Sequence, residues 1–209
     1  MPRALRTLAA AFLVFVSAAL PAAGWAAEKS ILVFGDSLSA AYGIAQSRGW
    51  VALLGERLKR EGSDYSVVNA SISGETTAGG LARIDAALEK HEPEVVVLAL
   101  GGNDGLRGLP VAQMQKNLSA MVERARRSGA RVLLVGVRIP PNYGPVYTEA
   151  FEGAFREVAK RHGTALLPFM LDGVADKADL FQPDRIHPTQ EAQPLIERNV
   201  WKALKPLLK

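Results

Sequence analysis

The chain has no cysteine among its 209 residues. This absence excludes disulfide bonds, thiolate metal sites, a cysteine nucleophile and a lipid-modified cysteine at a cleavage site. The folded protein must therefore be stabilised by its core alone. Because 48% of the residues are hydrophobic, a chain of this length can bury one substantial core, and we expect a single domain.

Histidine is also scarce, with His91, His162 and His187 as the only examples. No two of them have the short spacing of a metal-binding pair. We therefore expect no metal site.

Runs of one charge are missing as well. The formal net charge is +4, but the 25 basic residues are scattered among 21 acidic ones. Without a basic stripe the sequence gives no support for binding to nucleic acid, and the charges are typical of a solvated surface.

The one long apolar run lies near the start, from Leu8 to Leu20. Arg3 and Arg6 precede this run, and small residues follow it, which is the pattern of a secretory signal peptide. We expect a signal over residues 1–26, a mature domain over 27–209, and a periplasmic or secreted protein. An uncleaved anchor is the alternative, but the run is shorter than the roughly 17 to 25 residues that span a bilayer. We expect no stable membrane span after cleavage.

The remaining sequence alternates short β-branched runs with longer amphipathic stretches, which is typical of strands joined by crossover helices. This pattern predicts a three-layer α/β/α sandwich with a parallel sheet of about five strands. The predicted strands cover residues 31–34, 65–68, 94–100, 131–137 and 164–167, and the predicted helices cover 49–59, 78–91, 111–127, 147–161 and 191–207.

In such a sheet, ligands usually bind where the carboxyl ends of the strands meet. Neither the first predicted strand nor the central one runs into a Gly-x-Gly-x-x-Gly loop or a P-loop, so nucleotide binding is not indicated. The first strand instead runs into Gly35-Asp36-Ser37-Leu38-Ser39. Ser37 is a candidate nucleophile, and a helix N-cap is its alternative role.

A carboxylate and an imidazole lie three residues apart in Asp184-Arg185-Ile186-His187, just before the last predicted helix. Imidazole can take the proton of a serine hydroxyl, and a carboxylate can orient the ring. The other two histidines fall at predicted helix C-termini, where a cationic ring is favoured by the helix dipole. His187 is therefore the candidate base.

Acyl transfer also needs hydrogen-bond donors for a developing oxyanion. Gly74 follows the second predicted strand, and Asn103 follows the central one in Gly101-Gly102-Asn103-Asp104. A plain turn at Gly74 and a capping residue at Asn103 are the alternatives.

Gly35-Asp36-Ser37-Leu38, Gly74, Gly101-x-Asn103-Asp104 and Asp184-x-x-His187 together resemble, in order, the four sequence blocks of the SGNH, or GDSL, hydrolases. The resemblance extends over nearly the whole mature chain. In detail, the sequence is similar to the bacterial periplasmic thioesterase/arylesterase/lysophospholipase branch.

The resemblance implies a flavodoxin-like α/β/α fold with a five-stranded parallel sheet and no cofactor. It implies a triad of Ser37, Asp184 and His187, with an oxyanion hole from the Ser37 and Gly74 N–H groups and the Asn103 side chain. The implied substrates are small acyl compounds: aryl esters, fatty acyl thioesters and lysophospholipids. A mobile loop after the Asn block is implied to line an acyl groove, with the residues Gly105, Leu106, Arg107, Gly108, Leu109 and Pro110. Its glycines at 105 and 108 suit a hinge.

Two alternatives remain at this point. One is a periplasmic acyl- or lipid-binding protein that has lost the chemistry. The other is a peptidase, although amines leave less readily than thiolates or phenolates, so we expect peptides to be minor substrates. For the oligomeric state we expect a monomer.

Overall fold

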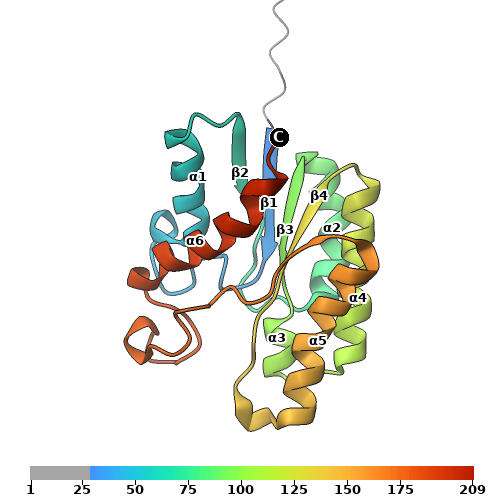
Figure 1. Ribbon diagram of the computed structural model, residues 1–209, viewed down its shortest axis with the longest axis vertical. Coiled ribbons are helices and arrows are strands. Elements are labelled where there is room, and N and C mark those ends of the chain that lie inside the picture. Colours follow the sequence, from blue (N-terminus) through green and yellow to red (C-terminus); the bar gives the residue numbers. More distant parts are fainter. Residues whose placement is uncertain (1–28) are drawn as a thin grey trace, which may run out of the picture.

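The computed structural model describes residues 29–209, and the predicted signal over 1–26 lies outside them. One parallel sheet runs through the molecule in the order β2-β1-β3-β4-β5 (Figure 1). Its strands are β1 (Lys29–Gly35), β2 (Tyr65–Asn69), β3 (Val95–Ala99), β4 (Arg131–Val135) and β5 (Ala165–Leu167). The helices are α1 (Trp50–Arg60), α2 (Thr77–His91), α3 (Gly102–Leu106), α4 (Val111–Arg127), α5 (Pro145–His162) and α6 (Gln193–Leu204).

The helices form two layers on the sheet. Helices α1 and α6 pack together on one face, while α2, α4 and α5 cover the other (Figure 1). Every residue of β3 is buried, as a central strand covered on both faces requires. The predicted α/β/α sandwich with five parallel strands is confirmed.

Most element bounds lie within two residues of the sequence prediction, and three differences have structural meaning. The strand predicted to reach residue 137 ends at Val135, and a short helix, α3, occupies a segment expected to be loop. The single helix predicted over 191–207 is α6 flanked by 3-10 turns at Gln190–Ala192 and Lys205–Leu207. Pro194 and Pro206 explain these breaks, because proline has no N–H to continue a helix and is tolerated only in its first turn.

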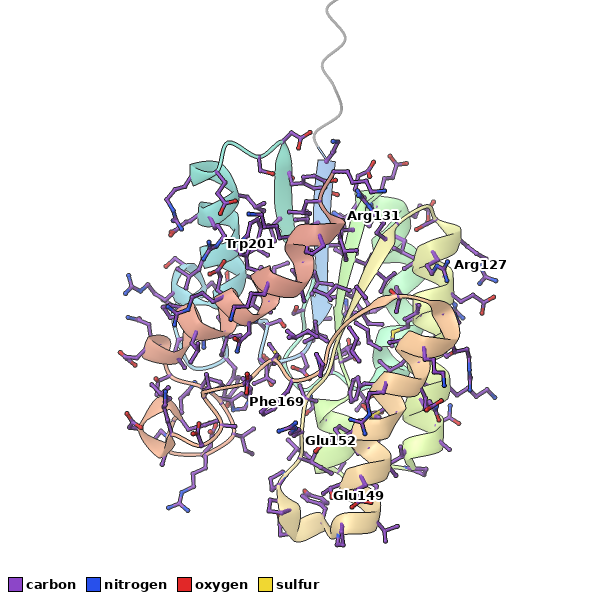
Figure 2. The ribbon with its side chains drawn as sticks, viewed as in Figure 1. Arg127, Arg131, Glu149, Glu152, Phe169 and Trp201 are labelled. Carbon is purple, nitrogen blue, oxygen red and sulfur yellow. The ribbon has the colours of Figure 1, made fainter. Side chains whose placement is uncertain are left out.

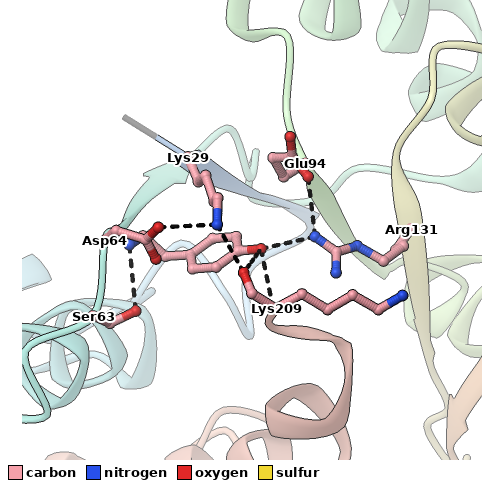
Figure 3. A network of polar contacts seen from close by, with 7 residues as sticks. Lys29, Ser63, Asp64, Glu94, Arg131 and Lys209 are labelled. Atoms are coloured by element: carbon pink, nitrogen blue, oxygen red, sulfur yellow. Dashed lines mark hydrogen bonds and ion pairs between the residues drawn. The ribbon is translucent and has the colours of Figure 1, made fainter. Parts of the chain in front are cut away.

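A polar network joins the two ends of the described chain near the starts of the strands (Figure 3). Lys29 Nζ donates to the Lys209 carbonyl at 2.8 Å and lies 2.9 Å from the Asp64 carboxylate. Arg131 donates to the Tyr65 hydroxyl at 2.7 Å. These contacts fix the amino edge of the sheet and leave the carboxyl edge open for a site.

No helix within residues 29–209 has both the length and the apolar character that crossing a membrane requires.

Candidate active site

Ser37, His187 and Asp184 form a continuous chain of hydrogen bonds. The Ser37 Oγ lies 2.9 Å from His187 Nε2, and His187 Nδ1 lies 2.7 Å from Asp184 Oδ2. A carboxylate can only accept, so Nδ1 carries the proton and Nε2 is the acceptor for the serine hydroxyl. The ring is therefore oriented as a base toward Ser37.

The loop that carries Asp184 and His187 is held closed by its own backbone. Gln182 N donates to the His187 carbonyl at 2.8 Å, and Phe181 and Pro188 form an antiparallel bridge. The side chain of Gln182 donates to the carbonyls of Pro188 and Tyr42. The loop is thereby fixed to the turn that follows Ser37, which sets the distance between the hydroxyl and the imidazole.

Asp184 is held as a carboxylate by its surroundings. Partial burial acts to raise its pKa, but hydrogen bonds from the His187 N–H, the His187 ring and the Ile186 N–H outweigh this and lower the pKa to about 2. Asp184 is thus ionised throughout the neutral range and can stabilise an imidazolium.

Ser37 lies in a turn directly after β1, and no helix begins at this residue. The N-cap alternative therefore does not hold. Its neighbour Asp36 is 3% exposed and accepts from Leu38 N at 3.1 Å. Burial raises the pKa of Asp36 to about 6.

Gly74 and Asn103 lie at the same cleft as Ser37. Gly74 has a φ of 79°, a left-handed conformation that favours glycine. Asn103 lies inside α3, and its Nδ2 donates to the Glu75 carbonyl at 3.0 Å, so it is not a capping residue. Within residues 29–209 the backbone N–H groups of Ser37 and Gly74 donate to no protein acceptor, which leaves both free for a ligand oxygen.

A buried network that the sequence did not predict lies behind these donors. Asp104 accepts from Thr77 N at 2.8 Å and from Thr77 Oγ1 at 2.5 Å. Asn117 of α4 donates to the same hydroxyl at 3.1 Å. Asp104 follows Asn103 and Thr77 lies shortly after Gly74, so the network fixes the two loops relative to each other.

The cleft has a volume of about 650 Å³ and receives residues from the ends of all five strands. Phe169, beyond β5, forms part of its wall, and Figure 2 shows it at the carboxyl edge of the sheet. Away from the triad the lining is largely apolar, with Leu106, Val137, Ile139, Pro140, Pro141, Leu171, Ala175 and Phe181.

The segment predicted to line an acyl groove meets the cleft through Leu106. Gly105 is buried in α3, where an added Cβ would lie 2.5 Å from Ile139 and 2.6 Å from Phe151. Close packing therefore explains this glycine better than the predicted hinge. Arg107 donates to the Gly74 carbonyl at 3.0 Å, while 108–110 are exposed beyond it.

The remaining histidines lie where they were predicted, at the ends of helices. His91 is the last residue of α2, and its carbonyl accepts from Ser30. His162 ends α5, and its Nε2 lies 2.6 Å from Ser119 Oγ. Both contacts belong to the scaffold.

Two neighbours of the triad were not predicted. The ring of Tyr42 lies 4.3 Å from that of His187, centroid to centroid, and Tyr42 is 51% exposed at the cleft. Gln182 closes the loop, as described above. No local sequence pattern predicts the role of either residue, because both contact segments that are distant along the chain.

A second hollow, of about 620 Å³, lies against β2 and is lined by none of the triad residues. Among the described residues no group of three or more histidine, cysteine or acidic side chains is arranged to hold a metal ion.

Comparisons with known proteins agree with this geometry. Residues 33–194 match the GDSL-like Lipase/Acylhydrolase family. The chain is 56% identical to Esterase TesA of Pseudomonas aeruginosa, over 88% of this chain and 91% of that protein. It is 43% identical to Thioesterase 1/protease 1/lysophospholipase L1 of Escherichia coli K12, over 88% and 86%. The solved psychrotrophic esterase EstA of Pseudoalteromonas sp., inhibited by monoethylphosphonate, has a TM-score of 0.82 and 46% identity, with 85% of this chain and 97% of that chain covered.

Proposed function

The chain belongs to the GDSL-like lipase/acylhydrolase family, and from this premise we propose that it cleaves acyl esters and thioesters through an acyl-enzyme on Ser37. That it is a hydrolase of esters and thioesters follows from its relatives, which are named esterase, arylesterase and thioesterase/lysophospholipase. The roles of individual residues are our proposal. The observation that carries it is the hydrogen-bonded chain from Ser37 Oγ through His187 to Asp184.

In the first step the Ser37 oxygen attacks the acyl carbonyl carbon while His187 Nε2 takes the hydroxyl proton. The carbonyl oxygen becomes an oxyanion. His187 then gives its proton to the departing alcohol or thiol, and the acyl group stays on Ser37. Water repeats the sequence, with His187 as base and then as acid, and releases the carboxylic acid.

The oxyanion is stabilised by three donors: the N–H groups of Ser37 and Gly74 and the Asn103 amide. The unpaired N–H groups and the cleft position of Asn103 support this role. Donors fixed before the reaction are effective because they need no reorganisation as charge develops. The ionised Asp184 steadies the imidazolium.

We assign the acyl chain to the apolar part of the cleft, along Leu106, Val137 and Ile139. Fatty acyl thioesters, aryl esters and lysophospholipids are the proposed substrates. The alternative of a non-catalytic acyl-binding protein is not favoured, because the relatives are named as enzymes and the base already contacts the serine.

Substitution of the triad tests the proposal. Ser37→Ala and His187→Ala are each expected to lower kcat by about three or more orders of magnitude. The thermal unfolding midpoint and circular dichroism of each variant serve as folding controls. A folded variant of either kind that kept near-native turnover would reject the assigned roles.

Export forms part of the same proposal: residues 1–26 act as a signal, and 27–209 form the single mature domain of a periplasmic or secreted enzyme. The basic start and apolar run support it. The N-terminal sequence of protein recovered from the periplasmic fraction should begin at Ala27. A membrane-bound protein that retained residues 1–26 would contradict the proposed cleavage of the signal.

A further inference from the structure

An arginine lies between the two residues of the catalytic loop in a conformation that favours glycine. Arg185 has a φ of 57° and is exposed. Its N–H donates to the Gln182 carbonyl at 2.9 Å, so the closed loop imposes this backbone. Residues other than glycine are disfavoured in this left-handed backbone conformation. The contacts within the loop do not explain why the residue is an arginine.

The guanidinium of Arg185 is available to a ligand. Arg185 is among the residues that line the cleft, and within residues 29–209 its guanidinium makes no hydrogen bond or ion pair. The neighbouring Asp184 carboxylate is already occupied by the His187 ring and by two backbone N–H groups. Asp36 is the one acidic residue of the cleft lining, and it is buried beneath Ser37.

A second arginine at the cleft is already partly neutralised. Arg138 lies 3.3 Å from the Glu152 carboxylate and 4.5 Å above the Phe169 ring (Figure 2 labels both partners). Arg185 is thus the cation at the cleft that lacks a protein partner among the described residues. On the side of the catalytic loop, Arg185 therefore brings an unpaired positive charge to the cleft.

The proposed mechanism indicates which part of a substrate lies near the Arg185 guanidinium. His187 must reach the departing oxygen or sulfur to protonate it, so the leaving group lies on the side of the catalytic loop. Arg185 is two residues from His187 on that loop. The acyl chain occupies the apolar side. Arg185 therefore lies on the leaving-group side of the cleft.

We propose that Arg185 determines specificity for substrates whose leaving group carries a phosphate. A guanidinium recognises phosphate oxygens through paired N–H donors. This inference rests on the proposed function. In a lysophospholipid the phosphate lies one glycerol away from the ester, whereas in an acyl-coenzyme A the phosphates lie beyond the long pantetheine arm. The position of Arg185 beside His187 favours the glycerophosphate leaving group.

The test compares purified wild-type protein with Arg185→Gln, Arg185→Lys and Arg185→Gly. The substrates carry one acyl chain on three leaving groups: glycerophosphoglycerol, as a lysophosphatidylglycerol, coenzyme A, and neutral p-nitrophenol. All are used below the concentration at which micelles form. For Arg185→Gln we expect kcat/KM on the phosphate substrates to fall about five- to tenfold, mainly through KM, because an exposed charged contact is modest in strength. The p-nitrophenyl ester should change less than about twofold.

Three controls isolate the charge. Arg185→Lys should restore most of the selectivity, and Arg185→Gly, which relieves the backbone, should behave like Arg185→Gln. Arg127→Gln makes the same charge change on α4, away from Phe169 and the cleft (Figure 2), and should leave all three substrates unchanged. Because salt screens exposed charges over about 8 Å at physiological ionic strength, the difference should shrink as salt is added.

A loss confined to one phosphate substrate would support the inference and identify the source of the phosphate. Equal changes on neutral and phosphate substrates, or no change on either, would overturn it. A wild-type protein inactive on all three leaving groups would instead reject the proposed function, so the two failures are distinguishable.

Discussion

The hydroxyl of Thr77 donates a 2.5 Å hydrogen bond to the buried carboxylate of Asp104. The contact joins the first residue of α2 to α3, and with them the loops of Gly74 and Asn103. This relationship makes the position of the proposed oxyanion donors depend on a group outside the cleft.

Replacing Thr77 with valine keeps the shape but removes the hydroxyl. Asp104 and Asn117 each lose a partner, so the free energy of unfolding should fall by about 1 to 3 kcal/mol. We expect kcat to fall several-fold at nearly constant KM, and Thr77→Ser to recover both. Urea unfolding and steady-state kinetics measure these effects.

Ser119→Ala is the matched control, because it removes a hydroxyl that contacts His162 on the scaffold. It should lower stability and leave kcat unchanged. If Thr77→Val lost stability but kept its full kcat, the network would be structural only.

Asn103→Ala tests the side-chain donor itself. Loss of one oxyanion donor lowers kcat by about 10²- to 10³-fold, with little change in KM if the amide acts on the transition state. Steady-state kinetics with a p-nitrophenyl ester give both constants. Weaker substrate binding at normal turnover would reassign Asn103 to ground-state recognition.

Asp36 should make stability depend on pH. Burial raises its pKa from 3.8 to about 6, so the folded state holds the proton more tightly than the unfolded state. The contribution of Asp36 to the free energy of unfolding is therefore fully present below its unfolded pKa of 3.8. This contribution is lost as pH rises through its folded pKa of about 6. The shift corresponds to about 3 kcal/mol.

Asp36→Asn removes this titration. Relative to wild type, the variant should gain about 3 kcal/mol of stability between about pH 4 and about pH 7, measured by urea unfolding. Asp184 also contributes stability, which is lost as pH falls from about its unfolded pKa of 3.8 through its folded pKa of about 2. This contribution is the same in both proteins and cancels in the comparison. A difference that stayed constant with pH would contradict the buried charge at Asp36.

Local patterns in the sequence were enough for the sheet and the order of its strands along the chain, and they also selected Ser37 and His187, which the fold brings within 2.9 Å of each other. Each of those features depends on neighbouring residues: a β-branched run, a turn glycine, a carboxylate three residues before an imidazole. The remainder could not be predicted in this way. The Tyr42 ring packs at a tilt against an imidazole 145 positions away along the sequence, and Thr77 and Asp104 are brought together by α2 and β3, which lie between them.

Gly105 is a second example of a feature that local sequence could not predict. Its place after the Asn block suggested a flexible hinge, since glycine permits many backbone angles. In the fold, Ile139 and Phe151 leave no room for a Cβ at this position. A steric requirement imposed by distant residues cannot be distinguished from a need for flexibility by local sequence.

Covalent labelling measures most directly whether Ser37 is an activated nucleophile. Purified protein is incubated with an organophosphonate ester, and peptide mass spectrometry locates the adduct. We predict one adduct per chain on Ser37, none on Ser37→Ala, and much slower labelling of His187→Ala. A folded wild-type protein that stayed unlabelled, or that carried the adduct on another residue, would contradict the account.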